Sequence, residues 1–174
     1  VSRMVGSIED ITDSETDPMT GAIMRAAGTE RIEQILKSDP EAGSVHAFMI
    51  ADLDNFKNLN DRLGHMWGDH ALHDVVKIIR DNCRAQDVIC RLGGDEFVVF
   101  FRDIPLDVLQ ERVKLLSEQL HITYENEGET VTISVSMGIA LTEKGKVTFQ
   151  ELYKRADKGL YEVKRTKKGT WHIV

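Results

Sequence analysis

The chain has 174 residues, which is enough for one domain with its own hydrophobic core. Apolar residues make up 41% of the chain and charged residues 29%, as in an ordinary water-soluble globular protein. The formal net charge of -7 argues against a surface that binds a nucleic-acid polymer, although a nucleotide site needs only a few local cations and a metal.

Cysteine usage and the lack of long apolar runs indicate the compartment. Cys83 and Cys90 are too few for a disulfide framework, so we expect two buried free thiols in a reducing compartment. No apolar run is long enough to span a membrane, and no signal peptide is visible. We therefore expect a cytoplasmic segment that makes no membrane contact.

The first 16 residues are expected to be a lead-in, and we place the domain itself at residues 17–174. Residues 6–13 have two interpretations of equal weight. They resemble the last strand and exit of a PAS sensor domain, or they are a disordered or tag-derived linker. The Val-Ser-Arg-Met start is compatible with a fragment of a longer protein.

The elements of the N-terminal half follow from composition and periodicity. Residues 17–21 form a predicted turn that leads into a helix ending near residue 37. Residues 38–44 have the composition of a loop. The apolar run 45–50 marks the first core strand, residues 45–52. Apolar side chains at helical spacing predict an amphipathic helix over 69–83.

The segment 91–97, Arg-Leu-Gly-Gly-Asp-Glu-Phe, lies between two apolar runs and predicts a tight β-hairpin over residues 88–101. Its glycines supply positive φ angles and allow a ligand to approach the backbone. Asp95 and Glu96 are adjacent carboxylates at an exposed turn, an arrangement that suits a divalent cation. The alternative, a plain Gly-Gly turn with solvated charges, has equal weight on the hairpin alone.

The C-terminal part continues with helices and strands in alternation. A three-four repeat of apolar residues predicts a helix over 106–120, and strict alternation predicts a half-buried strand over 131–139. A last helix begins near residue 149, and residues 171–174 form a short edge strand. The order is helix, β-α-β-β-α-β, helix, strand. It predicts an α+β fold with a ferredoxin-like antiparallel sheet covered by helices.

A second acidic segment favours the cation-site interpretation of the hairpin over a plain turn. Residues 51–61, Ala-Asp-Leu-Asp-Asn-Phe-Lys-Asn-Leu-Asn-Asp, place Asp52 and Asp54 at the end of the first core strand. A Gly-His pair and a Gly-Asp pair follow within residues 64–69 and open a helix. With the hairpin, these segments resemble the GGDEF domain family, the diguanylate cyclases, whose pattern is D-x-D-x-F-K-x-x-N-D, then G-H and G-D, then G-G-[DE]-E-F. The resemblance runs from about Asp17 to the C-terminus and implies a fold related to the palm of class III nucleotide cyclases.

The metal and catalytic residues follow partly from topology. A β-α-β-β connection makes the first strand and the hairpin neighbours, so Asp52 converges with Asp95 and Glu96. By resemblance, these carboxylates and the Leu53 carbonyl hold two Mg²⁺ or Mn²⁺ ions per active half-site, and Asp95 accepts the proton of the 3′-hydroxyl. Asp54 is interpreted as a brace for the loop, because the chain is expected to be leaving the strand there.

The resemblance also assigns the contacts to the base. Asn60 and Asp69 would read guanine, whose edge a carboxamide and a carboxylate complement, and Asp69 would favour GTP. The alternative for Asp69 is a helix N-cap. His65 would lie near the base or, in the more frequent case, brace the loop.

Phosphate contacts are expected from two regions. The Asn55 and Phe56 amides, with Lys57, would cradle the β- and γ-phosphates, and the Phe56 ring would anchor the core. Lys164 on the last helix matches a phosphate contact of the family. Lys168 stands where the family has arginine, so it keeps the charge but loses the bidentate fork, and weaker triphosphate binding is expected.

Arg84 and Asp87 precede the hairpin at the spacing of the family's R-x-x-D inhibitory site. There the dimeric product binds, because arginine bonds a guanine edge or a phosphate and aspartate bonds the guanine N–H groups. The alternative is a surface ion pair of little energetic value. The matching register favours product binding. A second arginine from a helix is expected, but the sequence does not identify it.

The N-terminal motif departs from the family pattern D-x-L-T-G-L-x-N-R. Met19, Ala22 and Met24 differ from it, and Met24 cannot replace the hydrogen bonds of an asparagine. By resemblance, this segment packs beside the active site and links it to an upstream sensor. The departure therefore concerns the geometry of activation more than the chemistry.

The resemblance implies a diguanylate cyclase, a nucleotidyltransferase that condenses two GTP into cyclic di-GMP and two pyrophosphates in the bacterial cytoplasm. The reaction is symmetric, so it requires a two-fold homodimer, and an upstream sensor domain is expected to support dimerisation. One alternative is a catalytically silent domain that senses cyclic di-GMP or GTP. Another is a related cyclase for a different base, which Asp69 disfavours.

Overall fold

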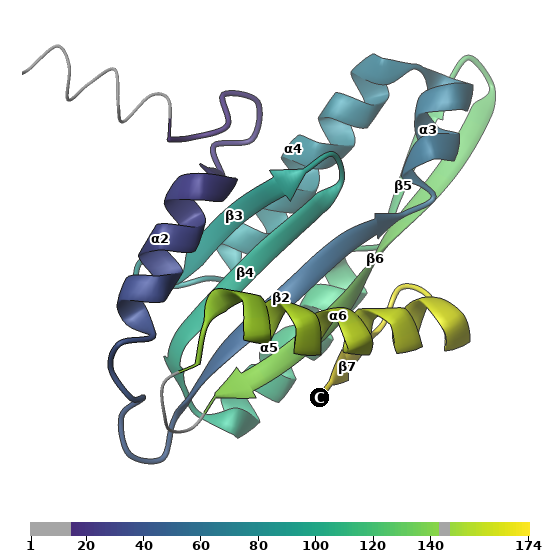
Figure 1. Ribbon diagram of the computed structural model, residues 1–174. Coiled ribbons are helices and arrows are strands. Elements are labelled where there is room, and N and C mark those ends of the chain that lie inside the picture. The colour runs from purple at the N-terminus through teal and green to yellow at the C-terminus, as the bar shows by residue number, and fades with distance from the viewer. Residues whose placement is uncertain (1–14, 143–146) are drawn as a thin grey trace, which may run out of the picture.

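The computed structural model describes residues 15–142 and 147–174, so the PAS-like segment predicted at residues 6–13 lies outside the described residues. The elements are shown in Figure 1. In chain order they are β1 (Ile23–Met24), α2 (Arg25–Ile35), β2 (Val45–Asp54), α3 (Phe56–Leu63), α4 (His65–Asp81), β3 (Val88–Gly93), β4 (Glu96–Ile104), α5 (Leu106–Gln119), β5 (Ile122–Asn126), β6 (Glu129–Thr142), α6 (Phe149–Thr166) and β7 (Trp171–Ile173).

The sheet is mainly antiparallel, with the strand order β1-β3-β4-β2-β6-β5 and β7 paired to β6. β2 is central and pairs antiparallel with β4 on one side and β6 on the other. β3 and β4 form the predicted hairpin. Two short additions, β1 beside β3 and β7 beside β6, are parallel. The predicted α+β fold, an antiparallel sheet covered by helices, is confirmed (Figure 1).

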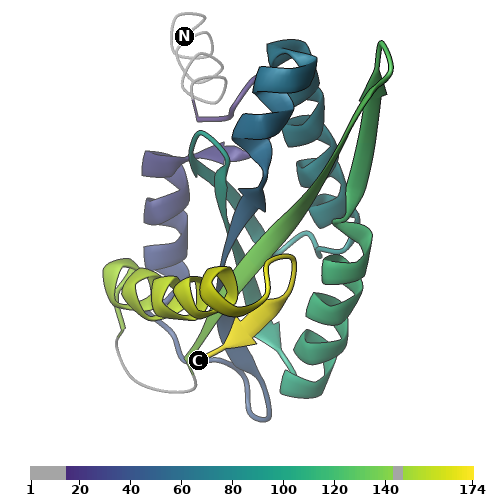
Figure 2. The same ribbon diagram turned by 90° about the vertical axis from the view of Figure 1, so that its right-hand side faces the viewer.

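Helices cover both faces of the sheet, with α2 and α6 on one side and α4 and α5 on the other (Figure 2). Alternation along β2 sends Phe48 and Ile50 to the α2 and α6 side, and Met49 and Ala51 to the opposite side. The same alternation turns Asp52, two residues beyond Ile50, toward α6. The face beneath α6 therefore carries the acidic end of β2.

The structure corrects the predicted end of the first core strand. β2 continues to Asp54, which still pairs in register with Ser134 of β6. The prediction ended the strand at residue 52 because a polar segment follows. The two acidic residues Asp52 and Asp54 are tolerated there because β6 continues alongside and hydrogen bonds the backbone of β2.

Three elements, β1, α3 and β5, were not predicted, and one helix starts earlier than expected. No helix was predicted at α3, although Phe56, Leu59 and Leu63 lie on one helical face against the core. α4 begins at His65 rather than at residue 69. β5 was missed because only Ile122 and Tyr124 of its five residues alternate as apolar positions.

Both cysteines are free, as predicted, but only Cys90 is fully buried. Cys83 is half-buried, so its predicted full burial is wrong. Cys83 lies after the end of α4, where the chain turns toward β3 and covers the thiol incompletely. Burial raises the pKa of both thiols, to about 12 for Cys83 and to about 11 for Cys90, which makes them poor nucleophiles.

Candidate functional site

The end of β2 and the β3–β4 hairpin meet at one edge of the sheet. Asp52 pairs in register with Glu96, so the two carboxylates are cross-strand neighbours on the α6 side. The Leu53 N–H donates to the Asp95 carbonyl at 3.2 Å, which ties the hairpin turn to β2. Because the N–H and C=O of one strand residue point to the same side, the Leu53 carbonyl also faces the hairpin. The structure thus brings together the four predicted metal-site residues.

Charge at this edge is incompletely compensated. Burial, followed by the nearby Asp95 and Glu96 carboxylates, raises the pKa of Asp52 to about 6, although the Lys164 ammonium opposes the shift. Lys164 Nζ lies 3.4 Å from Asp52 Oδ2. One cation therefore faces a group of carboxylates that repel each other.

Lys164 is itself held by Asp54, at 2.6 Å between Nζ and Oδ1. The Asp54 carboxylate is buried and also accepts from the Ser134 and Ser136 hydroxyls at 2.8 and 2.7 Å. Asp54 is thus a structural brace, but it holds α6 and not the loop named from the sequence. The expected strand end was also wrong, because Asp54 is still in β2.

Glu96 has a partner that sequence reasoning did not assign to the site. The Tyr153 hydroxyl of α6 donates to Glu96 Oε1 at 2.8 Å. Burial and this hydrogen bond raise the pKa of Tyr153 to about 12, so the phenol is a donor throughout the neutral range.

The donor set fits a hard divalent cation. Asp52, Asp95, Glu96 and the Leu53 carbonyl offer only oxygen, which Mg²⁺ prefers while retaining several waters. Among the described residues, no group of three His, Cys, Asp or Glu side chains is arranged to hold a metal ion by itself. Substrate phosphates and water would therefore complete the coordination, and a cation would relieve the repulsion seen in the raised pKa of Asp52.

The turn after β2 leads directly into α3. Asn55 adopts a left-handed conformation with φ of 70° as the N-cap residue, and its side-chain amide donates to the Thr132 carbonyl at 3.0 Å. Phe56 is half-buried against the core, as expected for an anchor, and Lys57 is exposed. The backbone amides predicted to cradle phosphate therefore lie at a helix N-terminus, a position that favours anions.

The residues predicted to read guanine lie on α3 and α4. Asn60 packs against Gly68, where a Cβ would collide with its Oδ1. That buried Oδ1 has no hydrogen-bond partner among the residues described. Asp69 is exposed in the second turn of α4, and Gly64 holds the N-cap position, so the N-cap alternative for Asp69 is wrong.

His65 and Lys168 are exposed. His65 is the first residue of α4, and within the described part of the chain its ring makes no hydrogen bond that would brace the loop. Lys168 lies in the turn between α6 and β7. The neighbouring Gly169 N–H donates to Ser136 Oγ at 3.0 Å, so Ser136 links this turn to Asp54.

Arg84 and Asp87 form a compact site just before β3, at the end of the hairpin opposite its turn. Arg84 Nη2 lies 3.1 Å from Asp87 Oδ1, and the Arg84 N–H donates to Asp87 Oδ2 at 2.8 Å. The Arg84 guanidinium also donates to the carbonyls of Arg102 and Asp103, and the Arg102 N–H donates to Asp87. The pair is therefore part of a hydrogen-bonded network rather than a loose surface ion pair.

Two further arginines lie near this pair. Arg80 of α4 lines the same hollow of about 320 Å³ as Arg84 and Asp87. Arg112 of α5 lines the adjoining hollow, and its Nη1 is buried without a hydrogen-bond partner among the described residues. Both hollows include Cys83. Sequence reasoning missed these arginines because a helix gives no local sign of which distant loop it faces.

The N-terminal motif is tied to the hairpin turn through Arg91. Arg91 Nη1 lies 2.9 Å from Asp17 Oδ2, and its guanidinium donates to the Gly94 carbonyl. Thr20 also donates to Asp17, at 2.6 Å. Met24, which replaces the asparagine of the family pattern, is 42% exposed. The described contacts thus link residues 17–20 to the backbone beside Asp95.

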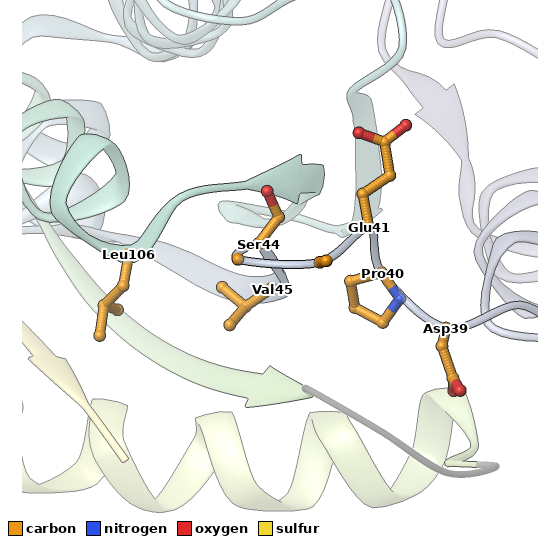
Figure 3. Close-up of a pocket in the computed structure, with 8 residues that line it drawn as sticks. Asp39, Pro40, Glu41, Ser44, Val45 and Leu106 are labelled. Carbon is orange, nitrogen blue, oxygen red and sulfur yellow. The ribbon is translucent and has the colours of Figure 1, made fainter.

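A separate hollow of about 510 Å³ lies at the opposite end of β2, between residues 39–45 and Leu106 (Figure 3). Its two carboxylates, Asp39 and Glu41, point away from one another (Figure 3). No predicted site residue lines it. The predicted metal-site residues lie at the other end of β2, where Asp52 pairs with Glu96.

Comparison with known proteins gives a family match over residues 14–170, to the family described as diguanylate cyclase, GGDEF domain. Response regulator PleD from Caulobacter vibrioides is 34% identical over 152 residues, which cover 86% of this chain and 34% of PleD. Diguanylate cyclase DgcP from Pseudomonas aeruginosa is 34% identical over 151 residues, which cover 86% of this chain and 22% of DgcP. The chain thus spans about a third or less of these curated relatives.

A solved structure has the same fold. The coiled coil and GGDEF domain of DgcB from Caulobacter crescentus, in complex with c-di-GMP, matches with a TM-score of 0.88 at 24% identity. The match covers 99% of this chain and 93% of that chain. Within the described residues of the present chain, no helix is both long and apolar enough to cross a membrane.

Proposed function

Because the chain belongs to the diguanylate cyclase GGDEF domain family, we propose that it condenses two GTP molecules into cyclic di-GMP and two pyrophosphates. The observation that carries the proposal is the meeting of Asp52, Asp95 and Glu96 at one edge, with the pKa of Asp52 raised to about 6. Carboxyl groups with perturbed pKa values cluster at functional sites. DgcP, which is 34% identical to this chain over 151 residues, is named a diguanylate cyclase.

The proposed roles follow from where the side chains lie. Asp52, Asp95, Glu96 and the Leu53 carbonyl would hold two Mg²⁺ or Mn²⁺ ions, which would neutralise phosphate charge and lower the pKa of the attacking hydroxyl. Asp95, at the turn, would accept the proton of the 3′-hydroxyl. Lys164, held by Asp54 beside Asp52, would contact the triphosphate.

Base recognition is proposed for Asn60 of α3 and Asp69 of α4. The unpartnered Asn60 Oδ1 is a buried acceptor, and such groups are rare unless a ligand satisfies them. Asp69 would accept from guanine N1 and N2. The Asn55 and Phe56 amides at the start of α3, with Lys57 and Lys168, would bind the phosphates.

Catalysis would require two copies of the domain, since each 3′-hydroxyl must attack the other nucleotide's α-phosphate. We also propose that cyclic di-GMP inhibits the enzyme at Arg84 and Asp87. The hollow that Arg80 shares with them, and the buried unpartnered Nη1 of Arg112, support an anionic ligand there. The partner arginine that the sequence did not identify would be Arg80 or Arg112.

The experiment is incubation of the purified chain with GTP and Mg²⁺, followed by chromatography for cyclic di-GMP. The chain would be tested at high concentration and as a fusion to a dimerising coiled coil. The Asp95→Ala variant removes the proposed proton acceptor, and Asp107→Ala, an exposed carboxylate on α5, is the matched control. We expect product from the parent and from Asp107→Ala but not from Asp95→Ala. No product from the dimerised parent would reject the cyclase proposal and favour a silent sensor of cyclic di-GMP or GTP.

A further inference from the structure

Tyr153 joins helix α6 to the acidic edge of the sheet. Its hydroxyl donates to Glu96 Oε1 at 2.8 Å across a sequence separation of 57 residues. α6 crosses the same face of the sheet on which alternation places Asp52 (Figure 1). The Tyr153 phenol therefore reaches the proposed metal site from the helix that also supplies Lys164.

The Tyr153 ring is held in place by aromatic packing. It stacks on Phe149 with ring centroids 6.5 Å apart and planes at 14°. Phe149 in turn packs edge-on against the buried Phe48 of β2, with centroids 5.0 Å apart. The Phe149 N–H donates to Glu33 of α2 at 3.0 Å. The phenol is thus fixed by core packing and not by the carboxylate alone.

A fixed donor constrains what a carboxylate can do. A carboxylate has two oxygens, and Oε1 of Glu96 already accepts from Tyr153. The other oxygen is left for a cation. Partners that orient a ligand in this way raise metal affinity, and their removal usually lowers it by 10- to 100-fold.

We propose that Tyr153 is a positioning residue that holds Glu96 in the orientation needed to bind a divalent cation. The proposal rests on the proposed function, because it takes Glu96 as a metal ligand. Tyr153 touches neither the nucleotide nor the reacting atoms in this account. Its effect is exerted through the Glu96 carboxylate, so it should appear in metal affinity before it appears in the chemical step.

The test is the Tyr153→Phe variant, which keeps the ring and its stacking on Phe149 and removes only the donor. Tyr161→Phe is the matched control, because Tyr161 lies on the same helix with 65% of its side chain exposed. Mn²⁺ binding would be measured with a non-hydrolysable GTP analogue from the loss of the free-ion electron paramagnetic resonance signal. The Mg²⁺ dependence of cyclic di-GMP synthesis would be measured in parallel.

We expect Tyr153→Phe to weaken Mn²⁺ binding about 10-fold and to raise the half-saturating Mg²⁺ concentration by a similar factor. The turnover at saturating Mg²⁺ should fall much less, and Tyr161→Phe should match the parent. Unchanged Mn²⁺ affinity in Tyr153→Phe would overturn the positioning role. If the parent binds Mn²⁺ with the analogue but makes no product, the cyclase proposal fails while the metal measurement still decides the role of Tyr153.

Discussion

The R-x-x-D site and the acidic strand edge differ in how completely their charged side chains are paired with groups of the protein itself. At the R-x-x-D site, Arg84 and Asp87 bond each other and the backbone of β4, so the network is closed before any ligand arrives. At the strand edge, Asp52 has a pKa raised to about 6 and shares a single cation with Asp54.

This difference has a consequence for ligand binding. A site with uncompensated charge gains stability when a cation enters, because repulsion is relieved. A site whose charges are already paired must give up part of its own hydrogen bonding to accept a ligand. Uncompensated charge at the strand edge suits a site that binds metal and nucleotide without rearrangement. The paired charges of the R-x-x-D site suit a site that binds product only at high product concentration.

The largest expected effect is loss of turnover in Asp52→Asn. The amide keeps the shape of the side chain but removes the negative charge that binds a cation. We expect the rate of cyclic di-GMP formation to fall about 10³-fold, in line with removal of a group that stabilises the transition state directly. Initial rates at saturating GTP would show it, with Asp107→Asn on α5 as control. A rate within tenfold of the parent would place the metal site elsewhere.

A smaller effect is expected from Lys164→Met, which retains the aliphatic stem and removes the ammonium. The buried Asp54 carboxylate would lose its cation, so the free energy of unfolding should fall by about 2 kcal/mol, and turnover by about 10²-fold. Chemical denaturation and initial rates would measure the two losses.

The double variant Asp54→Asn with Lys164→Met separates the two roles of the lysine. If Lys164 stabilises the fold through Asp54, the double variant should recover part of the lost stability without recovering activity. Recovery of both would mean that Lys164 acts only as a structural counter-ion and does not contact the triphosphate.

At the paired site, Arg84→Ala should relieve inhibition by cyclic di-GMP and leave initial rates without added product unchanged. It should also lower the free energy of unfolding by about 1–2 kcal/mol, because the Arg102 and Asp103 carbonyls and Asp87 lose a shared donor. Inhibition curves and denaturation would test this. Arg165→Ala, which breaks an exposed pair with Glu162, should cost less than 1 kcal/mol. Inhibition that persists in Arg84→Ala would contradict the assignment.

The smallest expected effect concerns His46, which lies behind the paired site. The Asp103 N–H donates to His46 Nδ1 at 3.0 Å. Burial lowers the pKa of His46 below its ordinary value of 6.5. The Asp103 carboxylate, the Ser38 backbone and Asp39 oppose this shift, whereas the Arg102 cation adds to it. The unfolded chain then binds a proton more readily, so stability is lost as the pH falls below about 6.5.

His46→Asn keeps an acceptor near the Nδ1 position and cannot titrate. We expect a flatter dependence of unfolding free energy on pH between about 5 and 7 in this variant than in the parent. Denaturation series at several pH values would measure the two slopes. Equal slopes would show that His46 does not titrate in this window.

The sequence predicted the parts of the fold and site that depend on local pattern. Alternation and apolar runs placed the core strands, and the β-α-β-β order brought Asp52 beside Glu96, as observed. α3 was missed because its apolar residues are interleaved with the polar motif that drew attention to it. The sequence also misplaced Asp69 at the start of α4. The helix begins at His65 after Gly64, which has no side chain that could cap it.

Contacts between distant elements could not be predicted in the same way. Tyr153 meets Glu96, and Arg80 shares a hollow with Arg84, because of how α6 and α4 cross the sheet. Helical periodicity shows which residues share a face of a helix, but not which strand end that face covers. The same limit hid the Asp54 contact with Lys164, which joins residues 110 positions apart.

The strand edge is destabilised by its own charge, and we expect a bound cation and nucleotide to stabilise it. The most direct measurement is thermal or chemical unfolding of the parent and Asp52→Asn at pH 7.5, with and without Mg²⁺ and a non-hydrolysable GTP analogue. Without ligand, the variant should be more stable by about 1–2 kcal/mol, since it avoids ionising a carboxyl whose pKa is raised. At about 100 times the dissociation constant, the parent should gain close to 3 kcal/mol and overtake the variant. A ligand-free variant that is less stable than the parent, or an equal gain in both proteins, would contradict the account.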